Sequence, residues 1–158
     1  MNMDVLRKQL VTQLTGGQAY TAVERIVRGF PAELASATSG KMRHTGWELL
    51  EHLRIAQQDI LRFTIDATYE SPAWPDGYWP LTSKPPSGEA WQASVDRFLA
   101  DLESVKALAR DSGIDLFETI VHGSGQTVLR EILLVADHNA YHLGQLLQLQ
   151  RTLEAPHG

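Results

Sequence analysis

The chain has 158 residues, of which 43% are hydrophobic and 21% are charged, and its formal net charge is −5. These proportions fit one soluble globular domain spanning residues 1–158. The negative charge and the scattered Lys and Arg residues exclude a nucleic-acid-binding surface, and the lack of Cys excludes disulfides and thiolate metal sites.

The sequence also lacks the signals of a membrane or secreted protein. Its first 13 residues place Asp4, Arg7 and Lys8 among isolated apolar residues, which is unlike the continuous apolar core of a signal peptide. The longest useful apolar run, residues 132–136, is far too short to cross a bilayer. We therefore expect a cytoplasmic protein with no membrane partner.

Helical periodicity begins near the N terminus. The apolar positions of the first predicted helix are Val5, Leu6, Leu10, Val11 and Leu14, and the pattern stops at the pair Gly16 and Gly17. A second helical stretch covers residues 19–30 and ends before Pro31, and a polar connection follows at residues 36–40. The two stretches form either separate helices or one kinked helix.

The middle of the chain contains one long helix and one long loop. Thr45 and Glu48 have the spacing of a capping box, which predicts a helix from there to about Tyr69. Residues 71–86 hold five of the seven prolines and two of the four tryptophans, so they form an irregular segment. Loops of that length usually have a function.

Two further helices are predicted after this loop. One begins at Ser87 and is closed by Gly113, and the last covers residues 127–153. Residues 114–126 are ambiguous, because residues 115–117 can be extended and residues 122–125 form a turn. Four amphipathic stretches without an alternating strand pattern predict an all-α four-helix bundle, with residues 71–86 as a long crossover connection.

The most informative segment is the last helix, where His138 and His142 are four residues apart. At that spacing both rings lie on one helical face and can hold one metal ion. Two imidazoles buried together on a mostly apolar helix are costly unless something binds them. A metal site is therefore the first hypothesis for this pair.

His52 is the candidate for a third ligand. It lies among Leu49, Leu53 and Ala56, on or near the face that this helix is expected to bury. Taken alone it is more readily a hydrogen-bonded structural histidine, but with His138 and His142 it completes a nitrogen-rich site. The other three histidines carry less weight. His44 precedes a helix cap, His122 lies in a turn that can line a pocket mouth, and His157 lies in a tail.

Three neutral imidazoles leave at least one coordination position open and leave the charge of a divalent ion uncompensated. Such an ion lowers the pKa of bound water to about 7 or accepts an anionic group such as a thiolate. Asn139 stands where a zincin has its catalytic Glu, and the Glu-x-x-His repeats of di-iron bundles are missing. Those two classes are excluded.

Four side chains are candidates for supporting the metal or lining its pocket: Glu48, Asp59, Tyr141 and Gln145. Glu48, Asp59 and Gln145 have the helical spacing to face the site, and a solvated or structural role fits each of them at least as well, while Tyr141 can wall an apolar pocket. The aromatic residues Trp74, Tyr78 and Trp79 can either wall a pocket over the metal or pin the loop to the core. No catalytic residue can be assigned from the sequence.

The segments 47–54 (WELLEHLR) and 137–145 (DHNAYHLGQ), with 130–133 (REIL) and the Trp-Pro loop, resemble the DinB-like superfamily, also called DinB/YfiT-like metalloenzymes. The resemblance implies a four-helix bundle with a metal bound by one His from the second core helix and two from the last. These correspond to His52, His138 and His142. It also implies nickel or zinc as the usual metal, and a homodimer.

For activity, the resemblance implies enzymes that use low-molecular-weight thiols such as bacillithiol or mycothiol, and some hydrolase-like members. We therefore expect a metal-dependent transferase or hydrolase that activates a thiolate or water towards a small-molecule substrate. The alternative is a non-catalytic metal- or small-molecule-binding stress-response bundle. A scaffold or dimerisation protein is the weakest hypothesis, because only the amphipathic helices support it.

Overall fold

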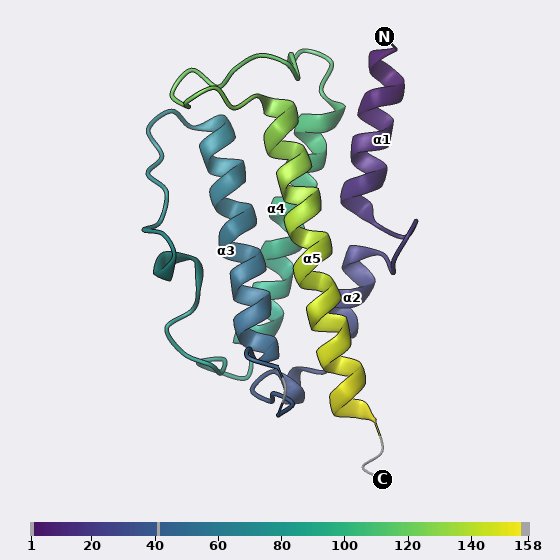
Figure 1. Cartoon of the computed structure of the whole chain (residues 1–158), viewed down its shortest axis with the longest axis vertical. Coiled ribbons are helices and arrows are strands. Elements are labelled where there is room, and N and C mark those ends of the chain that lie inside the picture. The colour runs from purple at the N-terminus through teal and green to yellow at the C-terminus, as the bar shows by residue number, and fades with distance from the viewer. Residues whose placement is uncertain (1, 41, 156–158) are drawn as a thin grey trace.

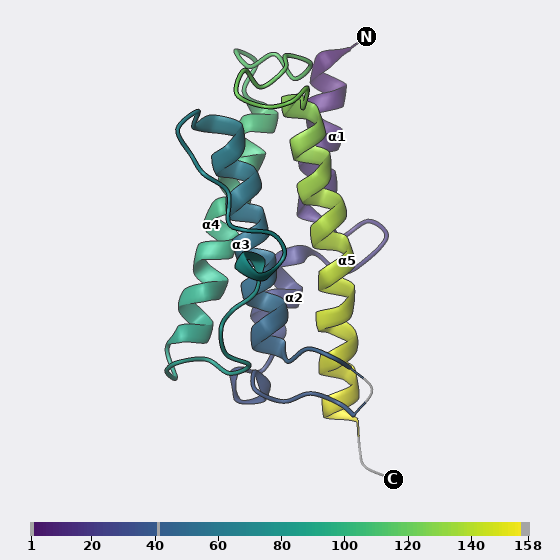
Figure 2. The same cartoon turned by 60° about the vertical axis from the view of Figure 1, so that its left-hand side comes forward.

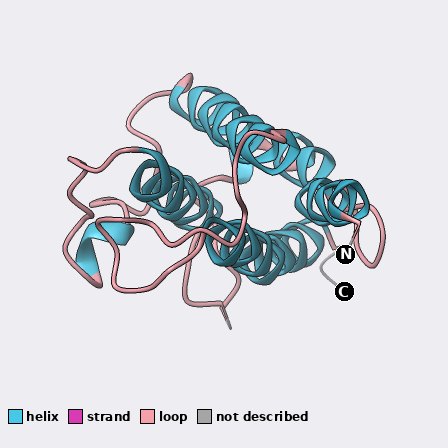
Figure 3. Ribbon diagram, turned by 90° about the horizontal axis from the view of Figure 1, so that it is seen from above, coloured by secondary structure: helices cyan, strands magenta, loops and turns pink. Residues whose placement is uncertain are grey.

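The computed structural model describes residues 2–40 and 42–155, and within them the chain forms five α-helices and no strand (Figure 3). The elements are α1 (Met3–Thr15), α2 (Val23–Gly29), η1 (Ala32–Leu34), α3 (Gly46–Ile65), η2 (Asp76–Tyr78), α4 (Ala90–Arg110) and α5 (Val128–Glu154), where η denotes a short 3-10 helix. The all-α class predicted from the sequence is confirmed. His157 lies outside the described residues.

The four long helices run roughly along the long axis of the molecule, and short α2 follows α1 in the same direction (Figure 1). Helices α3 and α4 point the same way, and α5 runs antiparallel to both. The segment between α3 and α4 must therefore return along the bundle, and it does so along the outer side of α3 (Figures 1 and 2). This is the predicted crossover connection.

Helix α3 is the central element, because it packs against both α4 and α5. The apolar faces of these helices form one core in which many Leu side chains are fully buried. The largest fully buried side chains of the three helices include Leu49, Leu50, Leu53, Phe98, Leu102, Ile132, Leu143, Leu146 and Leu149. This packing fixes the rotation of α3 relative to α5, and so decides which polar side chains of the two helices meet.

The capping box at the start of α3 is present as predicted. The Glu48 backbone N–H donates to the Thr45 hydroxyl at 3.2 Å, and the Thr45 N–H donates to the Glu48 carboxylate at 2.8 Å. The predicted end of this helix at Tyr69 is wrong, because α3 ends at Ile65. The Asp66 carboxylate accepts from the backbone N–H and hydroxyl of Thr68, which offers the backbone an alternative to helix.

The first two helices are separate, so the alternative of one kinked helix is wrong. Gly16 and Gly17 have φ of 70° and 81°, a conformation that favours glycine and ends α1. Gly17 N–H then donates to the Tyr20 carbonyl at 2.9 Å, which forms a turn, and α2 starts only at Val23 rather than at residue 19.

The later boundaries shift by a few residues. Helix α4 begins at Ala90 rather than at Ser87, whose carbonyl accepts from the Ala90 N–H in a turn. Helix α5 begins at Val128 rather than at Thr127, which is instead its N-cap. Residues 115–117 form a turn and not an extended segment, and Leu116 of this turn is fully buried. No helix in the described ranges is long and apolar enough to cross a membrane.

Candidate metal centre

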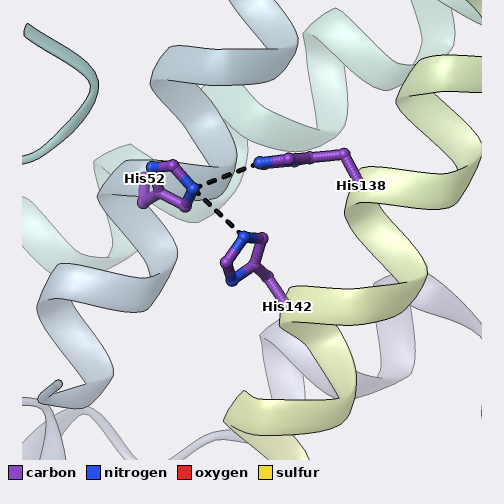
Figure 4. Close-up of side chains that lie close together, drawn as sticks. All are labelled: His52, His138 and His142. Carbon is purple, nitrogen blue, oxygen red and sulfur yellow. Dashed lines mark hydrogen bonds between the residues drawn. The ribbon is translucent and has the colours of Figure 1, made fainter. Parts of the chain in front are cut away.

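Three histidines from two antiparallel helices point at one another between α3 and α5 (Figure 4). His52 comes from α3, and His138 and His142 come from successive turns of α5. The Nε2 atom of His52 lies 3.1 Å from Nε2 of His138 and 3.1 Å from Nε2 of His142. Within the described residues, this is the one group of three or more His, Cys, Asp or Glu side chains close enough to share an ion.

The partners of Nδ1 fix the tautomer of two of these rings. His52 Nδ1 lies 2.8 Å from the Tyr78 carbonyl oxygen, and a carbonyl only accepts hydrogen bonds, so Nδ1 carries the proton. His142 Nδ1 lies 2.8 Å from Gln145 Oε1, which has the same consequence. The Nε2 atoms of both rings therefore present lone pairs to the space between them.

This arrangement fits a metal ion. Two lone pairs facing each other at 3.1 Å repel unless a cation lies between them. In a tetrahedral zinc site, metal–nitrogen bonds of about 2.0–2.1 Å place the ligand nitrogens roughly 3.3 Å apart. The observed spacing is close to that value, so the three histidines suit a divalent ion bound through Nε2.

Burial keeps the rings in the form that binds metal. Desolvation, assisted by the neighbouring His142 and His52, lowers the pKa of His138 to about 3. Burial also lowers the pKa of His52 and of His142. The neutral imidazole is the ligand form, so this environment disfavours protonation, which would compete with metal binding.

The crossover loop covers one side of the site with an aromatic side chain. The Trp79 ring stacks on His52 with centroids 3.9 Å apart and an angle of 3° between the planes. His44 stacks on the other face of Trp79 at 4.2 Å. His44, which carried little weight in the sequence, therefore lies beside the centre and stacks on the ring that covers His52.

A cavity of about 320 Å³ adjoins the three histidines. Most of its remaining lining is apolar or aromatic, and Asp59 is its one acidic side chain; the full set is Ala56, Asp59, Ile60, Trp74, Tyr78 and Leu134. The size lies at the lower end of the range for small-molecule pockets. A ligand in this cavity has direct access to the histidine cluster.

The structure places two of the predicted supporting residues in hydrogen bonds at the site. Asp59 lines the cavity, and its carboxylate accepts from the Tyr78 hydroxyl at 2.7 Å. Burial, followed by this hydrogen bond, raises the pKa of Tyr78 to about 12, so the hydroxyl stays protonated. Gln145 holds His142, as described above.

In the described residues, neither Glu48 nor Tyr141 hydrogen-bonds a histidine of the cluster. Glu48 is engaged in the capping box and lines a separate cavity beside Trp79 and His44. Tyr141 is 66% exposed, and its ring meets His142 edge-on at 4.8 Å. Of the remaining histidines, His122 contacts the Phe63 carbonyl at 2.7 Å and is not part of the cluster.

Three polar groups at or beside this site were not predicted from the sequence. The Tyr78 carbonyl is a backbone group and leaves no signature in a sequence. Gln57 and Asn139 are buried and bonded to each other next to the cluster. The sequence offers one indication of Gln57 and Asn139. Each is a polar residue on a helix face that otherwise buries apolar side chains.

Comparison with known protein families agrees with this geometry. A model of the DinB superfamily matches residues 17–146, which include all three histidines. The chain belongs to the DinB superfamily. No match was found among curated proteins or among solved structures. Membership of this family and the cluster of His52, His138 and His142 are together compatible with a metal site.

Proposed function

We propose that the chain is a metal-dependent enzyme of the thiol transferase or hydrolase type, with nickel or zinc held by His52, His138 and His142. The observation that carries this proposal is the convergence of three Nε2 atoms on the wall of a cavity large enough for a small molecule. A purely structural zinc site normally has four protein ligands and no adjoining cavity.

A divalent ion bound there supplies Lewis acidity, which lowers the pKa of a water molecule or a thiol so that the attacking anion exists near neutral pH. The residues of the chain orient and shield the reactants. Tyr78 and Gln145 hold two of the rings in the binding orientation, and Trp79 covers His52. Ala56, Ile60 and Leu134 exclude water from the cavity wall.

The shape and chemistry of the cavity favour a small substrate with an apolar body. Its volume of about 320 Å³ fits a compact molecule, and its apolar lining gives binding free energy without directional contacts. A low-molecular-weight thiol, which the family resemblance implies, is the proposed co-substrate. A homodimer stays a prediction from the same resemblance.

The test is elemental analysis of the purified protein combined with a thiol-transfer assay across several cofactor thiols and small electrophiles. We expect about one nickel or zinc ion per chain, since three ligands and one open position suit a single ion. The variant His142→Ala should lose both metal and activity, while His122→Ala, outside the cluster, should keep both. Wild-type protein that binds no metal at physiological concentrations would contradict the proposal, and metal without turnover would favour the non-catalytic alternative.

A further inference from the structure

A chain of buried amide side chains connects α4 to α5 by way of α3. Gln57 of α3 is fully buried, and its Nε2 donates to the Phe98 backbone carbonyl at 2.7 Å. Asn139 of α5 is 2% exposed, and its Nδ2 donates to Gln57 Oε1 at 2.8 Å. Asn139 directly follows the metal-ligand candidate His138.

The direction of every hydrogen bond in this chain follows from its first member. The Phe98 carbonyl only accepts, so Gln57 must present its NH₂ group to it. Gln57 therefore presents its oxygen to Asn139, and Asn139 must in turn present its NH₂ group to Gln57. The Asn139 oxygen is consequently the free end of the chain, and it is a hydrogen-bond acceptor.

Two polar atoms next to each other in the sequence are left without partners. In the described part of the chain, His138 Nδ1 and Asn139 Oδ1 are both sealed from solvent and have no hydrogen bond. One is a potential donor and the other is an acceptor. The two residues are consecutive positions of α5, so each is the nearest neighbour of the other along the helix. Leaving both groups unsatisfied would cost about 1–3 kcal/mol each.

We propose that Asn139 and Gln57 are positioning residues for the metal centre, and that Asn139 Oδ1 accepts a hydrogen bond from His138 Nδ1–H. The inference rests on the proposed metal-binding function and deepens it. It makes His138 the same tautomer as His52 and His142, with Nδ1 protonated and the Nε2 lone pair directed at the shared space. The amide chain thus does for His138 what the Tyr78 carbonyl does for His52.

The alternative tautomer shows why this matters. If His138 carried its proton on Nε2, it would donate to His52 Nε2, which lies 3.1 Å away, and the pair would be satisfied without metal. Breaking that hydrogen bond and moving the proton would then be part of the cost of binding an ion. By holding the proton on Nδ1, the amide chain removes this cost and preorganises the site.

The first test measures the tautomer of His138 directly. Metal-free protein labelled with ¹⁵N-histidine is studied by long-range ¹H–¹⁵N correlation at pH 7.5, and the signals are assigned by their loss in His138→Phe. We expect a protonated Nδ1 and a bare Nε2 in the wild type, and a mixture of tautomers in Asn139→Leu. A wild-type His138 protonated on Nε2 would overturn the proposal.

The second test measures affinity for Zn²⁺ by competition with a chromophoric chelator. Asn139→Leu keeps the approximate volume and removes the acceptor, and we expect its affinity to fall about 10–100-fold, as for the loss of other groups that orient metal ligands. Gln57→Met should cause a smaller loss, because Asn139 remains but is free to rotate. The control Ser94→Ala removes a buried hydroxyl whose hydrogen bond goes to Glu51 and not to a histidine, and the zinc affinity of this variant should equal that of the wild type.

Asn139→Asp separates positioning from simple structural support. It keeps an oxygen that accepts from His138, so a positioning role predicts tighter zinc binding than in Asn139→Leu. It also buries a charge, so a purely structural role predicts the reverse order. Equal zinc affinity in Asn139→Leu and the wild type would overturn this inference and leave the proposed function intact. Wild-type protein without any metal affinity would instead overturn the proposed function, while the tautomer measurement still decides the role of Asn139.

Discussion

At the scale of single residues, Tyr78 serves the site in two ways. Its backbone carbonyl accepts from His52 Nδ1–H, and its side-chain hydroxyl donates to Asp59. Asp59 and His52 lie two turns apart on α3, so Tyr78 of the crossover loop is bound to this helix at two separate positions. The side-chain contact should therefore stabilise the position of the carbonyl that orients His52.

Replacing Tyr78 with Phe tests this link. The change removes the hydroxyl and leaves the buried Asp59 carboxylate without its 2.7 Å hydrogen bond, while the backbone carbonyl remains. We expect a loss of about 1–3 kcal/mol in the free energy of unfolding, measured by urea denaturation, and weaker zinc binding. Tyr141→Phe is the matched control for stability, because this side chain is 66% exposed and its loss of a hydroxyl should change little. Identical behaviour of the two variants would show that Asp59 does not hold the loop.

At the scale of elements, the first turn of α3 is held in place by its close approach to a buried aromatic ring. A Cβ atom added at Gly46 would lie 2.6 Å from Cζ of Phe30. Phe30 is 3% exposed and packs against Trp91 at a centroid distance of 5.0 Å, so its ring has no room to move away. The start of the helix that presents His52 therefore requires glycine for steric reasons.

Two Gly→Ala substitutions should have opposite effects. Gly46→Ala should destabilise the protein by about 1–3 kcal/mol, because it overpacks the core at Phe30. Gly144 lies within α5, and a Cβ atom there would meet nothing within 4 Å. Gly144→Ala should stabilise the protein by about 0.5–1 kcal/mol, since alanine loses less backbone entropy in a helix. Thermal unfolding of both variants measures the difference, and a stabilised Gly46→Ala would contradict the packing argument.

At the scale of the whole molecule, the site exists only because α3 and α5 run side by side, which joins residues 86 and 90 positions apart in the chain. The same convergence brings three buried or half-buried imidazoles together. Each has a pKa below the ordinary value, and burial is the main cause in each case. Protonation of these groups is therefore coupled to unfolding of the bundle.

Metal-free protein should lose stability as the pH falls. The pKa of His138 is about 3 when folded and about 6.5 when unfolded, so the unfolded chain binds more protons at acidic pH. The contribution of neutral His138 to the free energy of unfolding is therefore complete above pH 6.5, and it is lost progressively as the pH falls towards 3. From His138 alone the loss by pH 5 is about 2 kcal/mol, and His52 and His142 change in the same direction.

Urea denaturation of chelator-treated protein between pH 7.5 and pH 5 measures this loss. His138→Leu is the comparison, because it removes the group with the largest shift, and its stability should depend less on pH. A wild type that is equally stable at both pH values would show that these histidines titrate normally in the folded state.

Much of the fold was predictable because its signals are local. The capping box at Thr45 and the glycine pair after α1 act through neighbours in the sequence, and both were read correctly. The end of α3 at Ile65 was not predicted, because apolar periodicity continues past this residue while the Asp66 side chain ends the helix. Within the site, the pairing of His138 with His142 follows from helical spacing alone.

The sequence by itself thus determined the helices, the absence of thiolate ligands and the face of α5 that carries two histidines, since each depends on residue type and short-range geometry. Only the tertiary structure decided the tautomers and the surroundings of the centre. The Tyr78 carbonyl and the Trp79 ring reach His52, and Gln57 joins Phe98 to Asn139, through the packing of α3, α4, α5 and the crossover loop. Such contacts join residues far apart in the chain, and no local pattern specifies them.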